Sequence, residues 1–321
     1  MYKALLVGLG QIGMGYDLEL SQDIYAYSHA RALSLHPEFK LVAAVEFDSS
    51  LRKIFEKTYG SPAYGSIEDA LEQKRIDLAV IATPTETHYP VLQSVLDGSK
   101  PKAILCEKPL SYSLTEARQI LSLCQEKQVL LYVNYMRRSE PGALEVKRRI
   151  DSGEIQGPMK GIVWYSKGFL HNGSHTFNLL EDWLGNMKDF SLIAPGQSFP
   201  SGDVELDVRV LFEKGEVVFI VAKEENFSLN SIELVAKNGR LRYENGGRSI
   251  KWTPIKCDNA LKGYTFLAET SEEIPSELNR YQLHVIEQLA NALNGNPSCL
   301  CEGRQALQTL ESMHSILTSR V

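Results

Sequence analysis

Two short segments, far apart in the chain, carry the side chains best suited to move a proton. Lys108 stands between Glu107 and Pro109, and His175 closes the segment 171–175, His-Asn-Gly-Ser-His. An imidazole, with a reference pKa of about 6.5, suits acid–base work at neutral pH, whereas a lysine near about 10.4 needs a large depression. We therefore predict proton transfer by His175. Lys108 is predicted to orient and polarise a substrate oxygen or to supply a proton to it, and a solvated strand-end lysine is the alternative.

A metal centre is a second chemistry to consider at these histidines. Two histidines four residues apart can bind a metal when both lie on one helix. No third ligand is evident nearby, and His171 precedes Gly173, which places it outside the helix predicted from residue 174, so we expect no metal. We assign the remaining histidines to the surface or to helix packing, with His88 also a candidate to line a ligand crevice: His29, His36, His88, His284 and His314.

A glycine motif at residues 8–13, Gly-Leu-Gly-Gln-Ile-Gly, follows directly on an apolar run. Where a strand turns into a helix, the first glycine permits the turn, the second lets backbone approach a pyrophosphate, and the third lets helix and strand pack closely. The N-terminus of the helix then faces the phosphates. The motif predicts a dinucleotide site that includes Gln11 and Ile12, and a plain strand–turn–helix is the alternative.

Glu46 ends the second apolar strand. A carboxylate there can accept both hydroxyls of an adenine ribose and repels a 2′-phosphate, so it favours NAD over NADP. Arg52 is the nearest residue that could favour NADP. The usual distance from the glycines is about 20 residues, but Glu46 lies 33 residues after Gly13. We attribute the excess to an inserted loop at residues 14–27, before a helix at 28–35.

Residues 1–135 alternate apolar strands and helices, which predicts a Rossmann domain with a doubly wound parallel sheet. The strands are expected at 2–7, 40–45, 76–82, 102–106 and 129–134, and further helices at 49–59, 66–72, 86–96 and 114–127. Such sheets bind ligands at the carboxyl ends of their strands. Distinctive residues stand at every one of these ends: Gly8, Glu46, Thr83-Pro84, Glu107-Lys108-Pro109 and Asn134-Tyr135.

Residues 136–321 predict a second, α+β domain with an open-faced, mostly antiparallel sheet. Alternating runs and hairpin-type turns at Lys214-Gly215 and Asn238-Gly239 indicate the strands, which we expect at 159–166, 204–212, 216–222, 231–236, 240–243 and 249–253. Helices are expected at 142–150, 174–184, 276–293 and 304–318.

Composition points to an ordinary globular protein. With 43% hydrophobic and 23% charged residues and a net charge of −6, the chain of 321 residues is a poor candidate for binding nucleic acid or an anionic membrane. It has no apolar run of membrane-spanning length, and its N-terminus enters a strand instead of a signal peptide. Five scattered cysteines without zinc-type spacing favour the reduced cytoplasm.

Taken together, the motifs resemble the Gfo/Idh/MocA oxidoreductase family. They are GLGQIG, ATPTETH at 82–88, EKP at 107–109, NYMRR at 134–138 and the GxH at 173–175. The resemblance implies a nicotinamide cofactor and hydride transfer on a sugar, cyclitol, sugar acid or nucleotide sugar. It assigns Lys108 and His175 to catalysis. The cofactor-binding candidates are Gly8, Gly10, Gln11, Ile12, Gly13, Glu46, Thr83, Pro84, His88, Glu107, Lys108 and Asn134. The substrate-binding candidates are Tyr135, Arg137 or Arg138, His171, Asn172 and Asn178.

Two positions depart from that family pattern. Many members have Asp four residues before the active-site histidine and three residues after it, where this chain has His171 and Asn178. Both changes remove negative charge, so an Asp partner for the histidine is in doubt. The alternative to an enzyme is a cofactor-binding sensor or partner protein of the same fold, because fold does not dictate function.

One face of the second sheet is expected to be covered by helices, because alternating positions are apolar: Val208, Val210, Phe212, Ile232, Leu234 and Ala236. The opposite face carries a mixed set: Glu205, Asp207, Arg209, Leu211, Val218 and Ile220. An antiparallel sheet can leave such a face in water. The resemblance instead implies a homodimer or homotetramer formed through this sheet.

Overall fold

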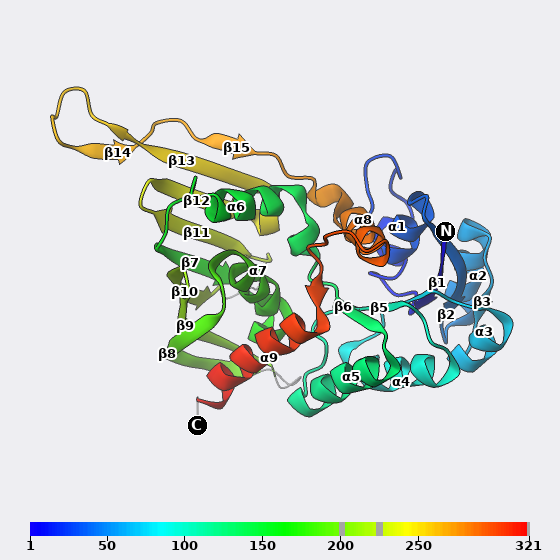
Figure 1. The fold of residues 1–321 in the computed structure, drawn as a ribbon. Coiled ribbons are helices and arrows are strands. Elements are labelled where there is room, and N and C mark those ends of the chain that lie inside the picture. Colours follow the sequence, from blue (N-terminus) through cyan, green and yellow to red (C-terminus); the bar gives the residue numbers. More distant parts are fainter. Residues whose placement is uncertain (199–202, 223–226, 320–321) are drawn as a thin grey trace. The chain divides into compact units, whose positions relative to one another are not determined.

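The computed structural model of this chain describes residues 1–198, 203–222 and 227–319. The chain forms two compact units (Figure 1). Unit 1 contains Met1–Ser139 and Asn279–Gln308, and unit 2 contains Glu140–Leu278 and Thr309–Val321. Residues 279–308, which the sequence assigned to the second domain, thus pack with the first unit.

Unit 1 is built on a seven-stranded sheet in the order β16-β6-β5-β4-β1-β2-β3. All neighbours are parallel except β16, which pairs antiparallel with β6. Because β1 lies between β2 and β4, the glycine motif that follows it stands where the chain order reverses, the usual ligand position in such sheets. The strands are β1 (Tyr2–Val7), β2 (Phe39–Val45), β3 (Ala63–Tyr64), β4 (Leu78–Ile81), β5 (Ala103–Cys106), β6 (Leu130–Val133) and β16 (Cys301–Glu302).

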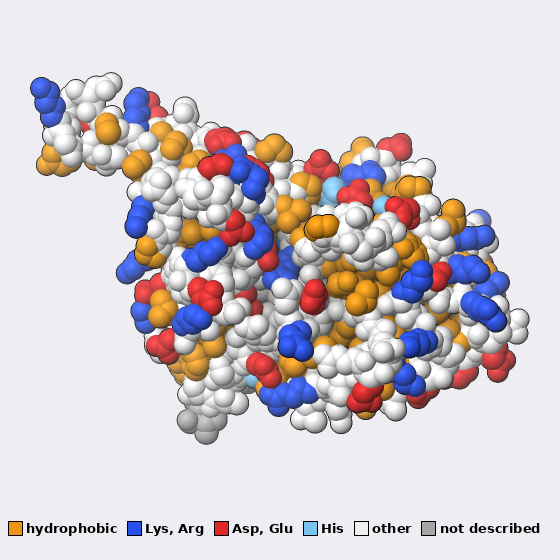
Figure 2. Space-filling model, viewed as in Figure 1, with side chains coloured by type: hydrophobic (Ala, Val, Ile, Leu, Met, Phe, Trp, Pro, Cys, Tyr) orange, Lys and Arg blue, Asp and Glu red, His pale blue; other side chains and the backbone are white. Residues whose placement is uncertain are grey.

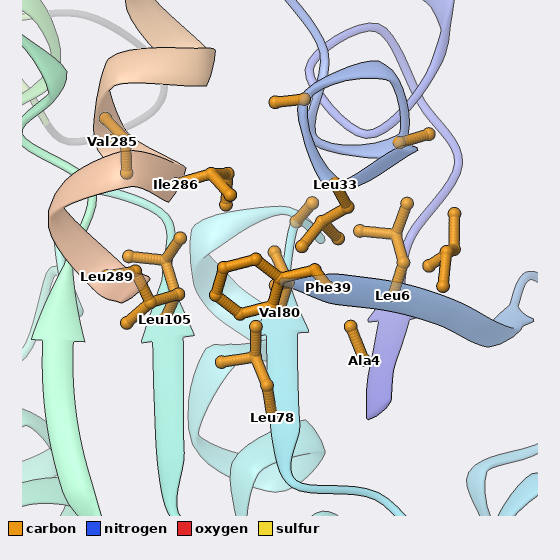
Figure 3. Packing of buried hydrophobic residues seen from close by; sticks show 14 of the residues in the cluster. Ala4, Leu6, Leu33, Phe39, Leu78, Val80, Leu105, Val285, Ile286 and Leu289 are labelled. Carbon is orange, nitrogen blue, oxygen red and sulfur yellow. The ribbon is translucent and has the colours of Figure 1, made fainter. Parts of the chain in front are cut away.

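Helices cover this sheet, and α8 (Tyr281–Leu293) is one of them. Figure 3 shows Val285, Ile286 and Leu289 of α8 beside Leu105 and Val80 of the sheet. This shared apolar core explains why a segment so late in the sequence belongs to the first unit. The other helices are α1 (His29–Leu35), α2 (Ser49–Tyr59), α3 (Ile67–Gln73), α4 (His88–Gly98) and α5 (Leu114–Lys127).

The inserted loop interrupts a helix without breaking its hydrogen bonds. The N–H of His29 donates to the carbonyl of Ile12 at 3.0 Å, and that of Ala30 to Gly13 at 2.9 Å. In an uninterrupted α-helix residues 16 and 17 would make these bonds. Helix α1 therefore continues the turn begun by the glycines, with 13 residues looped out. Subtracting them from the 33 residues between Gly13 and Glu46 leaves 20, the spacing that is usual for the ribose carboxylate.

The looped-out segment is held by a buried charge pair and by α8. The fully buried Asp17 carboxylate accepts the N–H groups of Tyr27 and Ser28 at 2.6 and 2.9 Å, and Arg31 donates to the Asp17 and Leu20 carbonyls. At its end, Ala26 exchanges backbone hydrogen bonds with the residues that precede and begin α8. The loop is thus a built part of unit 1.

Unit 2 contains a nine-stranded, mostly antiparallel sheet, so the fold class predicted for the whole chain is confirmed. One sheet face packs against helices, as expected: Val208, Val210, Phe212, Ile232 and Leu234 are at most 2% exposed. The strands are β7 (Met159–Tyr165), β8 (Met187–Ser198), β9 (Val204–Phe212), β10 (Gly215–Val221), β11 (Ser231–Ala236), β12 (Gly239–Glu244), β13 (Ser249–Cys257), β14 (Thr265–Leu267) and β15 (Glu272–Ile274). The helices are α6 (Pro141–Asp151), α7 (Ser174–Leu184) and α9 (Gly303–Thr318), whose last residues from Thr309 belong here.

Strands β8, β14 and β15 lie at the margins of the sheet and were not predicted. Strand β8 contains Pro195 and Gly196, and its register with β9 shifts repeatedly. Strands β13 and β14 form a two-stranded arm over residues 255–267 (Figure 1). Leu261, Tyr264 and Phe266 of this arm are exposed, and Figure 2 shows hydrophobic side chains on its surface. Within the described residues, no helix is long and apolar enough to cross a bilayer.

Candidate functional site

The glycine turn after β1 leaves an open approach to the backbone. Gly8 has φ +96°, and a Cβ added to it would lie 2.6 Å from the Ala82 carbonyl oxygen. A Cβ on Gly13 would lie 2.1 Å from the Gly8 oxygen, whereas one on Gly10 would meet nothing within 4 Å. Gly8 and Gly13 are therefore required by packing. Gly10 borders open space, where the missing Cβ admits a ligand to the backbone.

Glu46 closes the side of this turn that faces β2. One carboxylate oxygen accepts the N–H of Leu9 at 2.8 Å and the other accepts that of Asp48 at 3.1 Å. A carboxylate has about four lone-pair sites, so both oxygens keep capacity for ribose hydroxyls. Arg52 donates to the backbone carbonyls of residues 46 and 47 at 2.7 and 2.8 Å. These hydrogen bonds hold the turn at Glu46 in shape. They also engage the guanidinium of Arg52, the residue that could have favoured a 2′-phosphate.

A ring of four buried side chains lies at the carboxyl ends of β5 and β6. Glu107 Oε1 faces His29 Nε2 at 2.7 Å and Asn134 Nδ2 at 2.6 Å. Gln282 of α8 closes the ring, with its Nε2 2.7 Å from His29 Nδ1 and its Oε1 3.2 Å from Asn134 Nδ2. Burial raises the pKa of the Glu107 carboxyl, but the hydrogen bonds from His29 and Asn134 more than offset it, and the pKa falls below its ordinary value.

His29 and Gln282 were not identified from the sequence. His29 had been assigned to the surface or to helix packing, but it is fully buried and bonded to Glu107. Because 13 residues are looped out, His29 lies on the first helical turn after the glycines. Its distance from the glycines in the sequence does not indicate this position. No sequence signal indicates Gln282, which lies 148 residues from Asn134.

His88 holds two loops together. It is fully buried, with Nδ1 3.1 Å from the Leu110 carbonyl and Nε2 3.0 Å from the Thr83 carbonyl. Burial lowers the pKa of this imidazole, so the neutral form is favoured. Any effect of His88 on a cofactor is therefore indirect, through the segments around Thr83-Pro84 and Lys108-Pro109 that it connects.

Lys108 and the candidate substrate residues next to Asn134 lie in unit 1. The N–H of Lys108 points to Glu107 Oε2 at 3.3 Å, and the Lys108–Pro109 peptide bond is cis. Tyr135 is 4% exposed, and Arg137 is half-buried. Arg138 is buried and donates to Gln305 Oε1 at 2.8 Å, which leaves Arg137 as the more accessible arginine.

The second candidate cluster lies in unit 2, where residues 168–173 form a π-helical turn that leads directly into α7. His171 lies in this turn and therefore outside α7, as the sequence predicted. The turn is capped by Asp203, which accepts the N–H groups of Leu170 and His171 at 3.0 and 2.9 Å, a pairing favoured at helix N-termini. Asp203 was not identified from the sequence.

Aromatic packing positions the helix that carries His175. Phe169 and Phe177 contact Phe219 of the sheet, with ring centroids 6.3 and 5.6 Å apart. His171 is exposed, Asn172 is half-buried, and His175 is 9% exposed. Asn178 is 1% exposed and donates to Thr309 Oγ1 at 2.9 Å, so its side chain ties α7 to α9. No group of three or more metal-ligating side chains occurs among the described residues.

The residues of unit 1 fit a nicotinamide dinucleotide. Among the described residues, no hydrogen bond uses the N–H of Gly10, Gln11 or Ile12, so these donors remain for phosphate oxygens. Thr83 Oγ1 and Asn134 Oδ1 are buried and have no hydrogen-bond partner among the described residues. Buried polar atoms ordinarily find partners, and a ligand along this edge would supply them.

Comparison with known proteins agrees with this geometry. Residues 3–135 match the profile of the GFO_IDH_MocA family, described as an oxidoreductase family with an NAD-binding Rossmann fold. A relative, the scyllo-inositol 2-dehydrogenase (NAD(+)) of Bacillus subtilis, is 39% identical over 101 residues, which are 32% of this chain and 28% of that protein. The first curated relatives are matched over less than half of their own length.

Solved structures share the fold along the whole chain. An NAD binding oxidoreductase from Klebsiella pneumoniae superposes with a TM-score of 0.78 at 16% identity, covering 100% of this chain and 97% of that one. The WlbA dehydrogenase from Bordetella pertussis, solved in complex with NADH and UDP-GlcNAcA, gives 0.74 at 18% identity, covering 100% and 97%. At these identities the likeness establishes the fold.

The contrast between Gly10 and Gly13 yields a paired prediction. Gly10→Ala is expected to fold with the parent's thermal stability but to weaken NADH binding at least about tenfold, because its Cβ occupies the ligand side. Gly13→Ala is expected to lose about 2 kcal/mol of unfolding free energy, because its Cβ collides with the Gly8 carbonyl. Calorimetric titration and urea unfolding measure the two effects. Equal stability losses in both variants would contradict the assignment.

Proposed function

We propose that this chain, whose residues 3–135 match the Gfo/Idh/MocA family of NAD-binding oxidoreductases, transfers a hydride between nicotinamide and a carbohydrate-type alcohol or ketone. The observation that carries the proposal is the dinucleotide edge of unit 1, where the open Gly10 backbone, Glu46 and the buried Asn134 Oδ1 follow three different strands. The substrate class is a sugar, cyclitol, sugar acid or nucleotide sugar. The names of the inositol and UDP-sugar relatives support it.

The bound nicotinamide would accept or donate the hydride. In our proposal His175 removes the hydroxyl proton during oxidation and returns it during reduction, because imidazole changes charge near neutral pH. Lys108 directs its ammonium at the reacting oxygen and stabilises negative charge that develops there. Tyr135, Arg137, His171 and Asn172 contact the substrate, and Arg137 suits a carboxylate or phosphate. Asn178 then acts indirectly, through the packing of α7 on α9.

The decisive test is a turnover screen with NAD⁺ and cyclitols, sugars, sugar acids and nucleotide sugars, and with NADH and the corresponding ketones. A change in absorbance at the nicotinamide band with any of them supports the proposal. Tight NADH binding without turnover of any compound would instead favour the non-catalytic sensor or partner protein. The replacement of aspartates common in the family by His171 and Asn178 is the feature that favours that second function.

We further propose that the protein works in the cytoplasm. Its five cysteines are scattered along the sequence and lack zinc-type spacing, which favours a reducing compartment.

NAD(H) is expected to bind more tightly than NADP(H). The Glu46 carboxylate lies beside the Leu9 amide and would repel a 2′-phosphate, and Arg52 is engaged by the backbone. Calorimetry with both cofactors measures the preference. Glu46→Gln removes the charge and is expected to reduce the preference for NAD(H) over NADP(H). Glu56→Gln in α2 is the matched control and should leave that preference unchanged. Tighter NADPH binding by the parent would overturn the assignment.

Lys108→Ala and His175→Ala are each expected to lower kcat by at least about 100-fold, the usual effect of lost acid–base or electrostatic assistance. NADH affinity should stay within about threefold of the parent's, because neither side chain is proposed to hold the adenine half or the phosphates. Steady-state kinetics and NADH titration measure both. Turnover within a few-fold of the parent's would mean that the residue is structural.

The open face of the unit 2 sheet is proposed to join subunits into a homodimer or homotetramer. The mixed set predicted for it is exposed or half-buried, and Ile162, Trp164 and Val235 are 41 to 51% exposed. An obligate sheet-to-sheet interface would bury on the order of 2,000 Å². Sedimentation at micromolar concentration is expected to give at least twice the 36.0 kDa chain mass. A single species of that mass would rule out the assembly.

A further inference from the structure

The buried ring of Glu107, His29, Gln282 and Asn134 admits one arrangement of hydrogen atoms. The Glu107 carboxylate only accepts, so the atom of Asn134 that lies 2.6 Å away is its amide nitrogen. That nitrogen also faces Gln282 at 3.2 Å and must meet an acceptor, so the Gln282 oxygen points to it. Each contact in this way fixes the orientation of the next amide.

The remaining two contacts fix the proton on His29. With its oxygen turned to Asn134, Gln282 presents Nε2 to His29 Nδ1 at 2.7 Å. An amide nitrogen can only donate, so Nδ1 accepts and the ring proton is on Nε2, 2.7 Å from Glu107. The ring therefore closes with the Nε2–H of His29 donated to the Glu107 carboxylate. Reversing the Gln282 amide would place its nitrogen against the Asn134 nitrogen, so two donors would face each other. Reversing the Asn134 amide would place its oxygen against the Glu107 carboxylate.

The consequence lies at Asn134 Oδ1. The ring turns this oxygen away from Glu107, and it is buried without a partner among the described residues. Asn134 itself is 2% exposed, and a buried acceptor without a hydrogen-bond donor destabilises the fold. The oxygen thus requires a hydrogen-bond donor that the described chain does not supply.

The sheet order indicates which part of a dinucleotide can supply that donor. The adenine ribose belongs at Glu46 after β2, and the phosphates at the glycine turn after β1. Asn134 follows β6, and β6, β5 and β4 all lie on the other side of β1. A dinucleotide that crosses the switch point therefore extends its nicotinamide riboside half toward Asn134. The donors of that half are the carboxamide N–H groups and the ribose hydroxyls.

We propose that His29 and Gln282 are positioning residues for the cofactor: with Glu107 they lock Asn134 so that its Oδ1 accepts a hydrogen bond from the nicotinamide riboside half. The inference rests on the proposed function. It assigns a role in binding to a residue of α8 and to one on α1, neither of which needs to touch the ligand.

The test compares Gln282→Met with Gln288→Met. Methionine preserves length but can neither donate to His29 nor accept from Asn134. Gln288 lies on the same helix and accepts from the Cys299 N–H outside the ring, so it controls for loss of a glutamine hydrogen bond from α8. NADH, ADP-ribose and ADP are titrated calorimetrically into the full-length protein, because ADP lacks the riboside half altogether.

Gln282→Met is expected to weaken NADH binding about tenfold, the effect of losing one well-oriented hydrogen bond, and to leave ADP binding within twofold of the parent's. Gln288→Met should change neither. Weaker ADP-ribose binding as well would identify a ribose hydroxyl as the donor, and an effect confined to NADH would identify the carboxamide. An unchanged NADH affinity, or an equal loss for ADP, would overturn the proposal.

A second pair of variants covers the case in which Gln282→Met does not fold. His29→Gln keeps a donor toward Glu107 and an acceptor toward Gln282, whereas His29→Leu keeps neither. His29→Gln is expected to bind NADH at least fivefold more tightly than His29→Leu, and equal affinities would count against the ring. A parent protein that binds no NADH would refute the proposed function, whereas a parent that binds and variants that are unaffected would refute this inference alone.

Discussion

Two backbone hydrogen bonds, from His29 to Ile12 and from Ala30 to Gly13, join the glycine turn to α1 as one helix. The rest of unit 1 depends on this junction. It keeps the third glycine, Gly13, so close to Gly8 that a Cβ added to Gly13 would lie 2.1 Å from the Gly8 carbonyl oxygen. It also restores the expected 20-residue interval to Glu46 and places His29 beside Glu107. The phosphate, ribose and nicotinamide parts of the proposed site are therefore set by the same short helix.

The looped-out residues must be tied down, because a free excursion at this point would leave polar backbone groups buried beside the site. Asp17 satisfies those groups from inside the loop and Arg31 satisfies them from α1, and the segment around Asn279 satisfies others just before α8. Helix α8 thus has two tasks in unit 1. Its first turn anchors the loop and supplies Gln282, while its later turns fill the apolar core (Figure 3).

The sequence predicted the elements whose signals are local. Apolar runs that end in glycine, glutamate or Glu-Lys-Pro identified the strands of the Rossmann sheet, and the excess length before Glu46 revealed the insertion. It could not reveal Gln282, because a glutamine on an amphipathic helix shows no sign of a partner 148 residues away. The role of His29 was missed because its sequence number places it far from the glycines, whereas the helical hydrogen bonds place it on the turn that follows them. Strand β8 was missed because Pro195, Gly196 and a shifting register blur the alternation typical of strands.

The arm formed by β13 and β14 is a place where proteolytic cleavage would leave the fold intact. Residues 249–254 of β13 are paired with β12, and β15 pairs with part of the same stretch. Beyond residue 254 the only described strand that pairs with β13 is β14, over three residue pairs. The turn between them contains Lys262 and is exposed, as protease-sensitive loop tips usually are. Proteolysis by trypsin there would open the arm while the sheet on either side of the cut stays hydrogen-bonded.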